Sequence, residues 1–116
     1  MGDSNDEAFV KGLAEAALGK KASRLVLQDV TGVSDICNYQ LICSGSNPKQ
    51  NQAICDAVEF YAKSKHGSLP TAVEGAQTGS WILIDYGSVV VHIFDQSIRD
   101  FYALEHLWPK AVVVKV

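Results

Sequence analysis

Three aspartates that follow apolar runs of the chain are the first candidates for chemistry. Asp29, Asp85 and Asp95 each end a segment with the composition of a strand, and metal-dependent transferases gather carboxylates at such positions. No Asp-x-Asp pair is present to chelate one ion. Single carboxylates at strand ends more commonly cap the following turn. The pattern therefore favours turn capping and no bound metal.

A serine between a strand and a helix is the second candidate. Gly45-Ser46 precedes a strong helix start at Asn47-Pro48, where backbone N–H groups can hold an anion. Neither GxxxxGK[ST] nor GxGxxG is present, so a plain strand-to-helix turn is favoured. The alternative function is a nucleotidyltransferase-like enzyme, with Ser46 near phosphate and Asp29 and Asp85 near magnesium.

His92 and the three cysteines are weaker candidates for catalysis. His92 has no Ser or Cys partner in a recognisable nucleophile elbow, so it is expected to be a hydrogen-bonded packing residue or an interface residue. Cys37, Cys43 and Cys55 form no CxxC pair and have no His at zinc spacing. Buried free thiols are predicted, with no cofactor.

Composition limits the class of protein. The chain has 116 residues, a net charge of −3 and 47% hydrophobic residues, which is typical of one globular domain over residues 1–116. The acidic balance argues against a nucleic-acid backbone as the main partner. No apolar run is long enough to span a membrane. The start MGDSNDEAF has no basic leader followed by an apolar segment, so a cytoplasmic location is expected.

The elements that must position these residues alternate between helix and strand. A helix is predicted over about 7–18 with Gly19 as its stop, and a second from Pro48 to near Gly67 with Asn47 as its cap. Strands are predicted over about 24–30, 36–44 and 71–74, then a hairpin, a last helix from Ser97 to Trp108 and a short tail over 109–116. This order indicates an α/β fold, with a mixed sheet of about five strands flanked by helices.

The hairpin around Gly87 has two different faces. Its apolar face, which helices are expected to cover, carries Ile82, Ile84, Val89, Val91 and Ile93. Its mixed face carries Trp81, Leu83, Asp85, Val90, His92 and Phe94. A two-residue turn at Tyr86-Gly87 would pair Ile84 with Val89, Ile82 with Val91 and Trp81 with His92. Function is expected on the mixed face, where Trp81 is either a core residue or an interface anchor.

One region of the chain is similar to a known family. The run EGAQTGSWILIDYGSVVVHIFDQSIRDFYALEHLW, with LVLQDVTGVSDICNYQLICSGSNPKQNQAICDAV upstream, resembles the ribosomal silencing factor family, also called RsfS or Iojap. The likeness covers roughly residues 25–108. The positions that match in order are Glu74-Gly75, Trp81, Asp85-Tyr86-Gly87, Val91-His92, Arg99, Tyr102, Leu104-Glu105 and Leu107-Trp108.

The resemblance implies a non-enzymatic translation repressor. Members of the family bind an L-fourteen-type protein of the large ribosomal subunit and block joining with the small subunit when nutrients are scarce. Their fold is similar to that of nucleotidyltransferases, without the catalytic carboxylates. The chain departs from the family where Asn38 and Ser88 replace common acids, Gln40 a frequent aromatic residue and Lys49 a common Arg.

The resemblance and the hairpin together predict a docking surface. Trp81, Leu83 and Asp85 of the mixed face, with Tyr86 at the turn, His92, and Tyr102 on the nearby helix, are predicted to contact the ribosomal protein. Steric blocking needs no catalytic group. A third interpretation is that the same face forms a homodimer.

Overall fold

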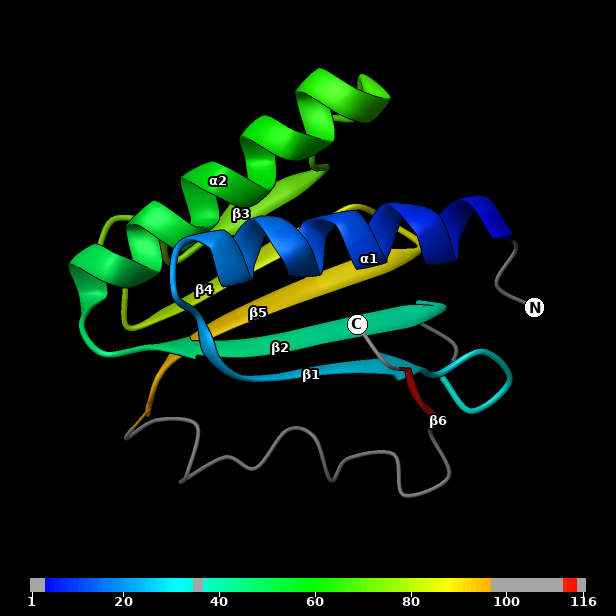
Figure 1. The fold of residues 1–116 in the computed structure, drawn as a ribbon, viewed down its shortest axis with the longest axis horizontal. Coiled ribbons are helices and arrows are strands. Elements are labelled where there is room, and N and C mark those ends of the chain that lie inside the picture. The colour runs from blue at the N-terminus through cyan, green and yellow to red at the C-terminus, as the bar shows by residue number, and fades with distance from the viewer. Residues whose placement is uncertain (1–3, 35–36, 97–111, 115–116) are drawn as a thin grey trace.

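The described residues form one six-stranded sheet with two helices on the same face (Figure 1). The computed structural model describes residues 4–34, 37–96 and 112–114. Its elements in chain order are α1 (Ser4–Gly19), β1 (Ser23–Asp29), β2 (Tyr39–Gly45), α2 (Pro48–His66), β3 (Ala72–Glu74), β4 (Trp81–Asp85), β5 (Val89–Asp95) and β6 (Val112–Val114). The strand order is β3-β4-β5-β2-β1-β6. Because β2 and β5 are parallel and the other pairs antiparallel, the predicted mixed sheet is confirmed.

Local sequence sets the ends of both helices. At the start of α2 the Asn47 side chain accepts a hydrogen bond from the Gln50 backbone N–H (2.8 Å), and Pro48 occupies the first helical position, as predicted. Gly67 ends α2 in the left-handed conformation, with φ +61°. Helix α1 ends at Gly19 as predicted, but the left-handed residue is Lys21, at φ +64°.

The larger of two core clusters lies between the helices and the apolar face of the sheet. Neither described helix is long and apolar enough to cross a membrane. The residues of the apolar hairpin face are all 0% exposed and share one cluster with residues of α1 and α2. This confirms that the helices cover that face. The members of the hairpin that belong to this cluster are Ile82, Ile84, Val89, Val91 and Ile93.

The predicted pairing of the hairpin is wrong by two residues. Leu83 pairs with His92, Ile84 with Val91 and Trp81 with Phe94, instead of Trp81 with His92. Because a shift of two residues preserves the alternation of side chains, the membership of each face stays as predicted.

The chemistry of the turn explains this shift. The Tyr86 N–H donates to the Val89 carbonyl (2.9 Å), so Gly87 and Ser88 are the central residues instead of Tyr86 and Gly87. Gly87 takes the first central position with φ +86°, which suits glycine in a type II′ hairpin. The Asp85 carboxylate accepts the Gly87 N–H (2.7 Å) and stabilises this arrangement.

The sheet has six strands instead of about five. The additional strand, β6, pairs with β1 through three residues, Leu27 with Val114, Gln28 with Val113 and Asp29 with Val112. A run of three valines is too short to show an alternation of side chains, so the sequence pattern does not predict a strand within residues 109–116. The last predicted helix, Ser97 to Trp108, lies outside the described residues.

Candidate functional site

Strand β4 presents three predicted contact residues on the face of the sheet opposite the helices. Trp81, Leu83 and Asp85 alternate with the fully buried Ile82 and Ile84 and are themselves half-buried. This alternation places the three side chains in one row along the strand. The structure thus brings together three of the six residues predicted for the docking surface and leaves each partly open to solvent.

The loop before β4 is fastened to α2 by two side-chain amides. Asn51, which is fully buried, donates from Nδ2 to the Gly79 carbonyl (2.8 Å). Gln52 donates from Nε2 to the carbonyls of Ala76 (2.9 Å) and Gln77 (3.0 Å). These bonds fix the point at which the chain enters β4 and therefore the position of Trp81.

A hollow of about 240 Å³ lies beside Trp81. It is lined by Glu74, Gly75, Trp81 and Leu83. Gly75 has φ +79°, and a Cβ there would collide with the Trp81 carbonyl, so glycine is required where the loop passes over the strand. The ring of Trp81 packs on Phe94, with centroids 4.7 Å apart. Reasoning from the hairpin alone missed Glu74 and Gly75, because their approach to Trp81 depends on the pairing of β3 with β4.

His92 lies beside this row and is almost entirely buried. It pairs with Leu83, is 8% exposed, and stacks parallel to the Phe94 ring at 5.9 Å. Its Nδ1 has no hydrogen-bond partner among the described residues, so the predicted hydrogen bond is not found at that nitrogen. Burial lowers the pKa of His92 to about 4, and the imidazole is neutral at physiological pH. It packs at the side of the row and offers little surface for contact.

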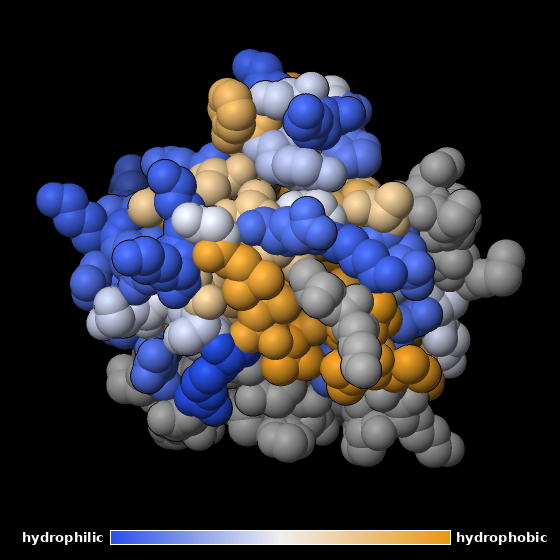
Figure 2. Space-filling view, in the orientation of Figure 1, coloured by the Kyte–Doolittle hydropathy of each residue, from blue (hydrophilic) through white to orange (hydrophobic). Residues whose placement is uncertain are grey.

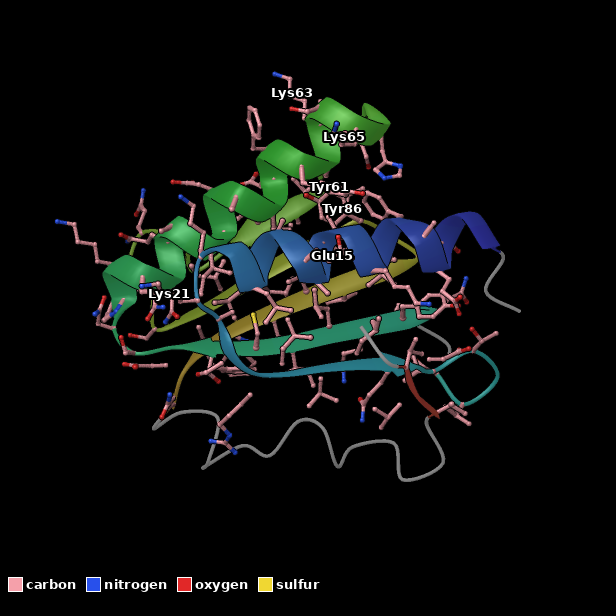
Figure 3. The ribbon with its side chains drawn as sticks, in the orientation of Figure 1. Glu15, Lys21, Tyr61, Lys63, Lys65 and Tyr86 are labelled. Carbon is pink, nitrogen blue, oxygen red and sulfur yellow. The ribbon has the colours of Figure 1, made fainter. Side chains whose placement is uncertain are left out.

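Tyr86, predicted as a contact residue at the turn, lies on the helix side of the sheet, away from the row formed by Trp81, Leu83 and Asp85. Tyr86 packs against the helix-side core, and its ring meets Phe9 of α1 edge-on at 5.3 Å. Figure 3 shows it near Tyr61, on the helix side of the sheet. Burial, with the nearby Glu59 and Cys55, raises the pKa of Tyr86 to about 12. Tyr86 flanks the two-residue turn instead of occupying one of its central positions. Tyr102 lies outside the described residues.

Two of the three aspartates, Asp29 and Asp85, cap turns, as the pattern favoured. Asp29 accepts a hydrogen bond from the Thr31 N–H (2.9 Å), in the same way that Asp85 accepts from Gly87. Within the described part of the chain, no three His, Cys, Asp or Glu side chains gather where they could hold a metal ion. The three cysteines are free and buried, which confirms that prediction, and burial with nearby Glu59 raises the pKa of Cys55 to about 12.

The residues of the alternative nucleotide site lie at opposite ends of the sheet. Ser46 follows Gly45 at the end of β2 that is level with Asp95. Asp29 pairs with Tyr39 at the other end of β2, and Asp85 lies at that same end, opposite Val90. A strand of this length spans about 20 Å. The serine and the two carboxylates therefore cannot contact one phosphate and its metal.

Ser46 is also hydrogen-bonded to a residue close to it in the chain. Both its N–H and its hydroxyl donate to Gln50 Oε1, at 2.7 Å each, while Gln50 Nε2 donates to the Lys20 and Lys21 carbonyls (3.2 Å each). These bonds join the start of α2 to the end of α1. Ser46 has the structural role that a strand-to-helix turn predicts.

Known proteins resemble the chain over nearly its whole length. Residues 3–116 match the family described as ribosomal silencing factor during starvation, RsfS. The chain belongs to the RsfS family. The ribosomal silencing factor RsfS of Bacillus subtilis is 36% identical over 107 residues, covering 92% of this chain and 90% of that protein. This membership confirms the resemblance drawn from the hairpin and its flanks.

A solved structure and a more distant relative also resemble the chain. A crystal structure from Chromobacterium violaceum superposes with a TM-score of 0.84 at 27% identity, over 89% of this chain and 85% of that one. The mouse protein named mitochondrial assembly of ribosomal large subunit protein 1 is 33% identical over 73 residues, which cover 61% of this chain and 32% of that protein. The RsfS fold of the chain is thus shared with a solved structure.

Asn38 and Ser88, where the family resemblance leads us to expect acids, share one hydrogen-bond partner. Asn38 Nδ2 and Ser88 Oγ both donate to the carboxylate of Asp6, at 3.3 and 3.1 Å. Acids at positions 38 and 88 would instead bring three carboxylates together. In this chain the two donors connect the first turn of α1 to the residue before β2 and to the hairpin turn.

Proposed function

We propose that the chain binds the large ribosomal subunit through its L-fourteen-type protein and prevents joining with the small subunit, as a translation repressor active under nutrient limitation. RsfS membership and the row formed by Trp81, Leu83 and Asp85 support the proposal. The row is half-exposed, contains one large aromatic residue and borders a hollow, which are the properties of an interface anchor. Ribosome binding would place the chain in the cytoplasm.

The charge of the row favours a protein over RNA as the direct contact. Glu74 lines the hollow and Asp85 ends the row, so this edge of the sheet carries negative side chains. Carboxylates repel a phosphate backbone, whereas they suit the basic surface of a ribosomal protein. Repression would then act by exclusion of the small subunit and would need no catalytic step.

Co-sedimentation with purified large subunits tests the proposal. Trp81→Ala removes the aromatic anchor and is expected to cost about 2 to 4 kcal/mol of binding free energy. Because Trp81 also packs on Phe94, a second variant is needed that leaves this packing intact. Glu74→Lys reverses a charge at an exposed residue that lines the hollow. Leu69→Ala, at a residue 68% exposed and outside the hollow, is the control and should bind as the wild type does.

The same protein samples test whether the chain blocks subunit joining and whether the mixed face instead forms a homodimer. Wild type added before the small subunit should reduce the yield of joined ribosomes, and Glu74→Lys should reduce it less. Undiminished binding by both Trp81→Ala and Glu74→Lys would show that the surface is assigned wrongly. Sedimentation velocity distinguishes the homodimer, because a dimer that dissociates in the Trp81 variant would assign this face to self-association.

A further inference from the structure

A second surface lies on the opposite side of the molecule, between the two helices. A groove of about 580 Å³ runs along α1 and α2. Small half-exposed or exposed residues form its floor, and the aromatic rings of α2 form its wall. The lining consists of Ala16, Gly19, Lys20, Ala53, Asp56, Ala57, Phe60, Tyr61, Ser64 and Lys65.

The groove has an exposed aromatic residue that the fold does not use. Phe60 is 74% exposed, which is more than any other large apolar residue in the described ranges. Figure 2 shows weakly apolar surface between the helices, with hydrophilic side chains around it. An exposed phenyl ring beside an apolar groove is unfavourable in water and marks a binding surface.

The charges around the groove have a definite order along it. Lys20 lies at one end and Lys65 at the other. Lys21 adds to the first end and Lys63 to the second, as Figure 3 shows. Between the two ends the lining carries a carboxylate, Asp56, and Glu15 of α1 is exposed nearby. The surface is therefore positive at both ends and negative between them.

We propose that this groove binds a short amphipathic helix of a partner protein, with an apolar ridge and acidic residues at both of its ends. From Ala53 to Lys65 helix α2 is about 18 Å long at 1.5 Å per residue, which is just over three turns and matches a short helical segment. A floor of alanine and glycine allows a helix to approach closely, and such helices dock through residues at i, i+3, i+4 and i+7. The acidic ends would meet the lysines, and the ridge would cover Phe60.

This surface is independent of the one proposed for the ribosome. The groove lies over the helix layer, whereas Trp81, Leu83 and Asp85 lie on the other face of the sheet (Figure 1). A helix bound between α1 and α2 would leave the β4 row uncovered. The chain would then be able to hold a second protein while it is bound to the large subunit.

The probe is a synthetic helical peptide of about 18 residues, in which leucines form a ridge along the central three turns and glutamates stand at both ends of that ridge. Its matched control carries lysines at the ends instead. Fluorescence anisotropy against the full chain should show saturable binding of the glutamate peptide and at least about tenfold weaker binding of the lysine peptide. In NMR spectra of the labelled chain, the methyl signals of Ala53 and Ala57 should shift.

Variants of exposed residues locate the binding. Phe60→Ala and the double variant Lys20→Glu/Lys65→Glu should each weaken the glutamate peptide about tenfold or more, while Lys49→Glu, an exposed lysine outside the groove, should change it less than about twofold. The peptide assay contains no ribosomal subunit, so its result does not depend on the proposed function. If the proposed function is also correct, all of these variants should still co-sediment with large subunits.

Three results would overturn the proposal. The first is that neither peptide binds, or that both bind equally. The second is that Trp81→Ala abolishes peptide binding and Phe60→Ala does not, which would place the peptide on the β4 row. The third is a dimer that Phe60→Ala dissociates, which would identify a second copy of this chain as the occupant of the groove.

Discussion

The buried imidazole of His92 should make the stability of the fold depend on pH. Burial lowers its pKa to about 4 from an ordinary value of 6.5. Above pH 6.5 the ring is neutral in both the folded and the unfolded chain. Between pH 6.5 and about pH 4 only the unfolded chain takes up the proton, so the free energy of unfolding falls by about 1.4 kcal/mol per pH unit. The total loss attributable to His92 is about 3 kcal/mol.

Urea unfolding across this pH range measures the effect. His92→Leu removes the titrating group and keeps a side chain of similar volume, so this variant should lack that part of the pH dependence. Near neutral pH it should be within about 1.5 kcal/mol of the wild type. Carboxylates titrate in every variant, so the quantity to compare is the difference in free energy of unfolding between each variant and the wild type. His66→Gln, at an exposed histidine, is the control. Parallel curves for wild type and His92→Leu would refute the assignment of a buried, neutral imidazole.

Further predictions follow from the other contacts. Tyr86→Phe removes a buried hydroxyl without a partner among the described residues, so urea unfolding should show unchanged stability or a gain of up to about 1 kcal/mol; lost co-sedimentation with large subunits would contradict its placement in the core. Ser88→Asp should lower the free energy of unfolding by about 2 kcal/mol, because it replaces a donor to Asp6 with a like charge. Asp6→Asn should recover most of that loss in a double-mutant cycle, whereas additive losses would exclude the repulsion. Native protein should not react with Ellman's reagent until it is unfolded, because all three thiols are buried; rapid reaction of Cys55 would show that the helix layer opens.

The sequence patterns predicted the faces of the hairpin better than its pairing. Side chains alternate with period two whatever the turn, so Ile82 and Ile84 on one face and Trp81 on the other followed from order alone. The pairing depends on which two residues form the turn. That choice was decided by the Asp85 carboxylate and by the positive φ of Gly87 at the first central position, two features that a Tyr-Gly pair in the sequence does not distinguish.

The alternation of side chains along a strand does not predict the direction of the Tyr86 side chain at the turn. Tyr86 follows the last residue of β4, and there the strand geometry no longer determines which face a side chain takes. Its ring lies with Phe9 of α1, a contact between residues far apart in sequence that only the assembled helix layer creates. The hollow beside Trp81 has the same kind of origin, because it requires the pairing of β3 with β4.

The position of Trp81 near the edge of the sheet explains how one face can be both core and contact surface. Strand β4 has the short β3 on one side and the long β5 on the other. Toward β5, the same face carries Val90, His92 and Phe94, all of which are buried. Toward β3, only three residues pair with β4, so Trp81 and Leu83 remain half-exposed with the hollow beside them. A rigid aromatic side chain packed on Phe94 loses little conformational freedom when it binds. Preorganisation by the buried half of this face therefore supports docking through the exposed half.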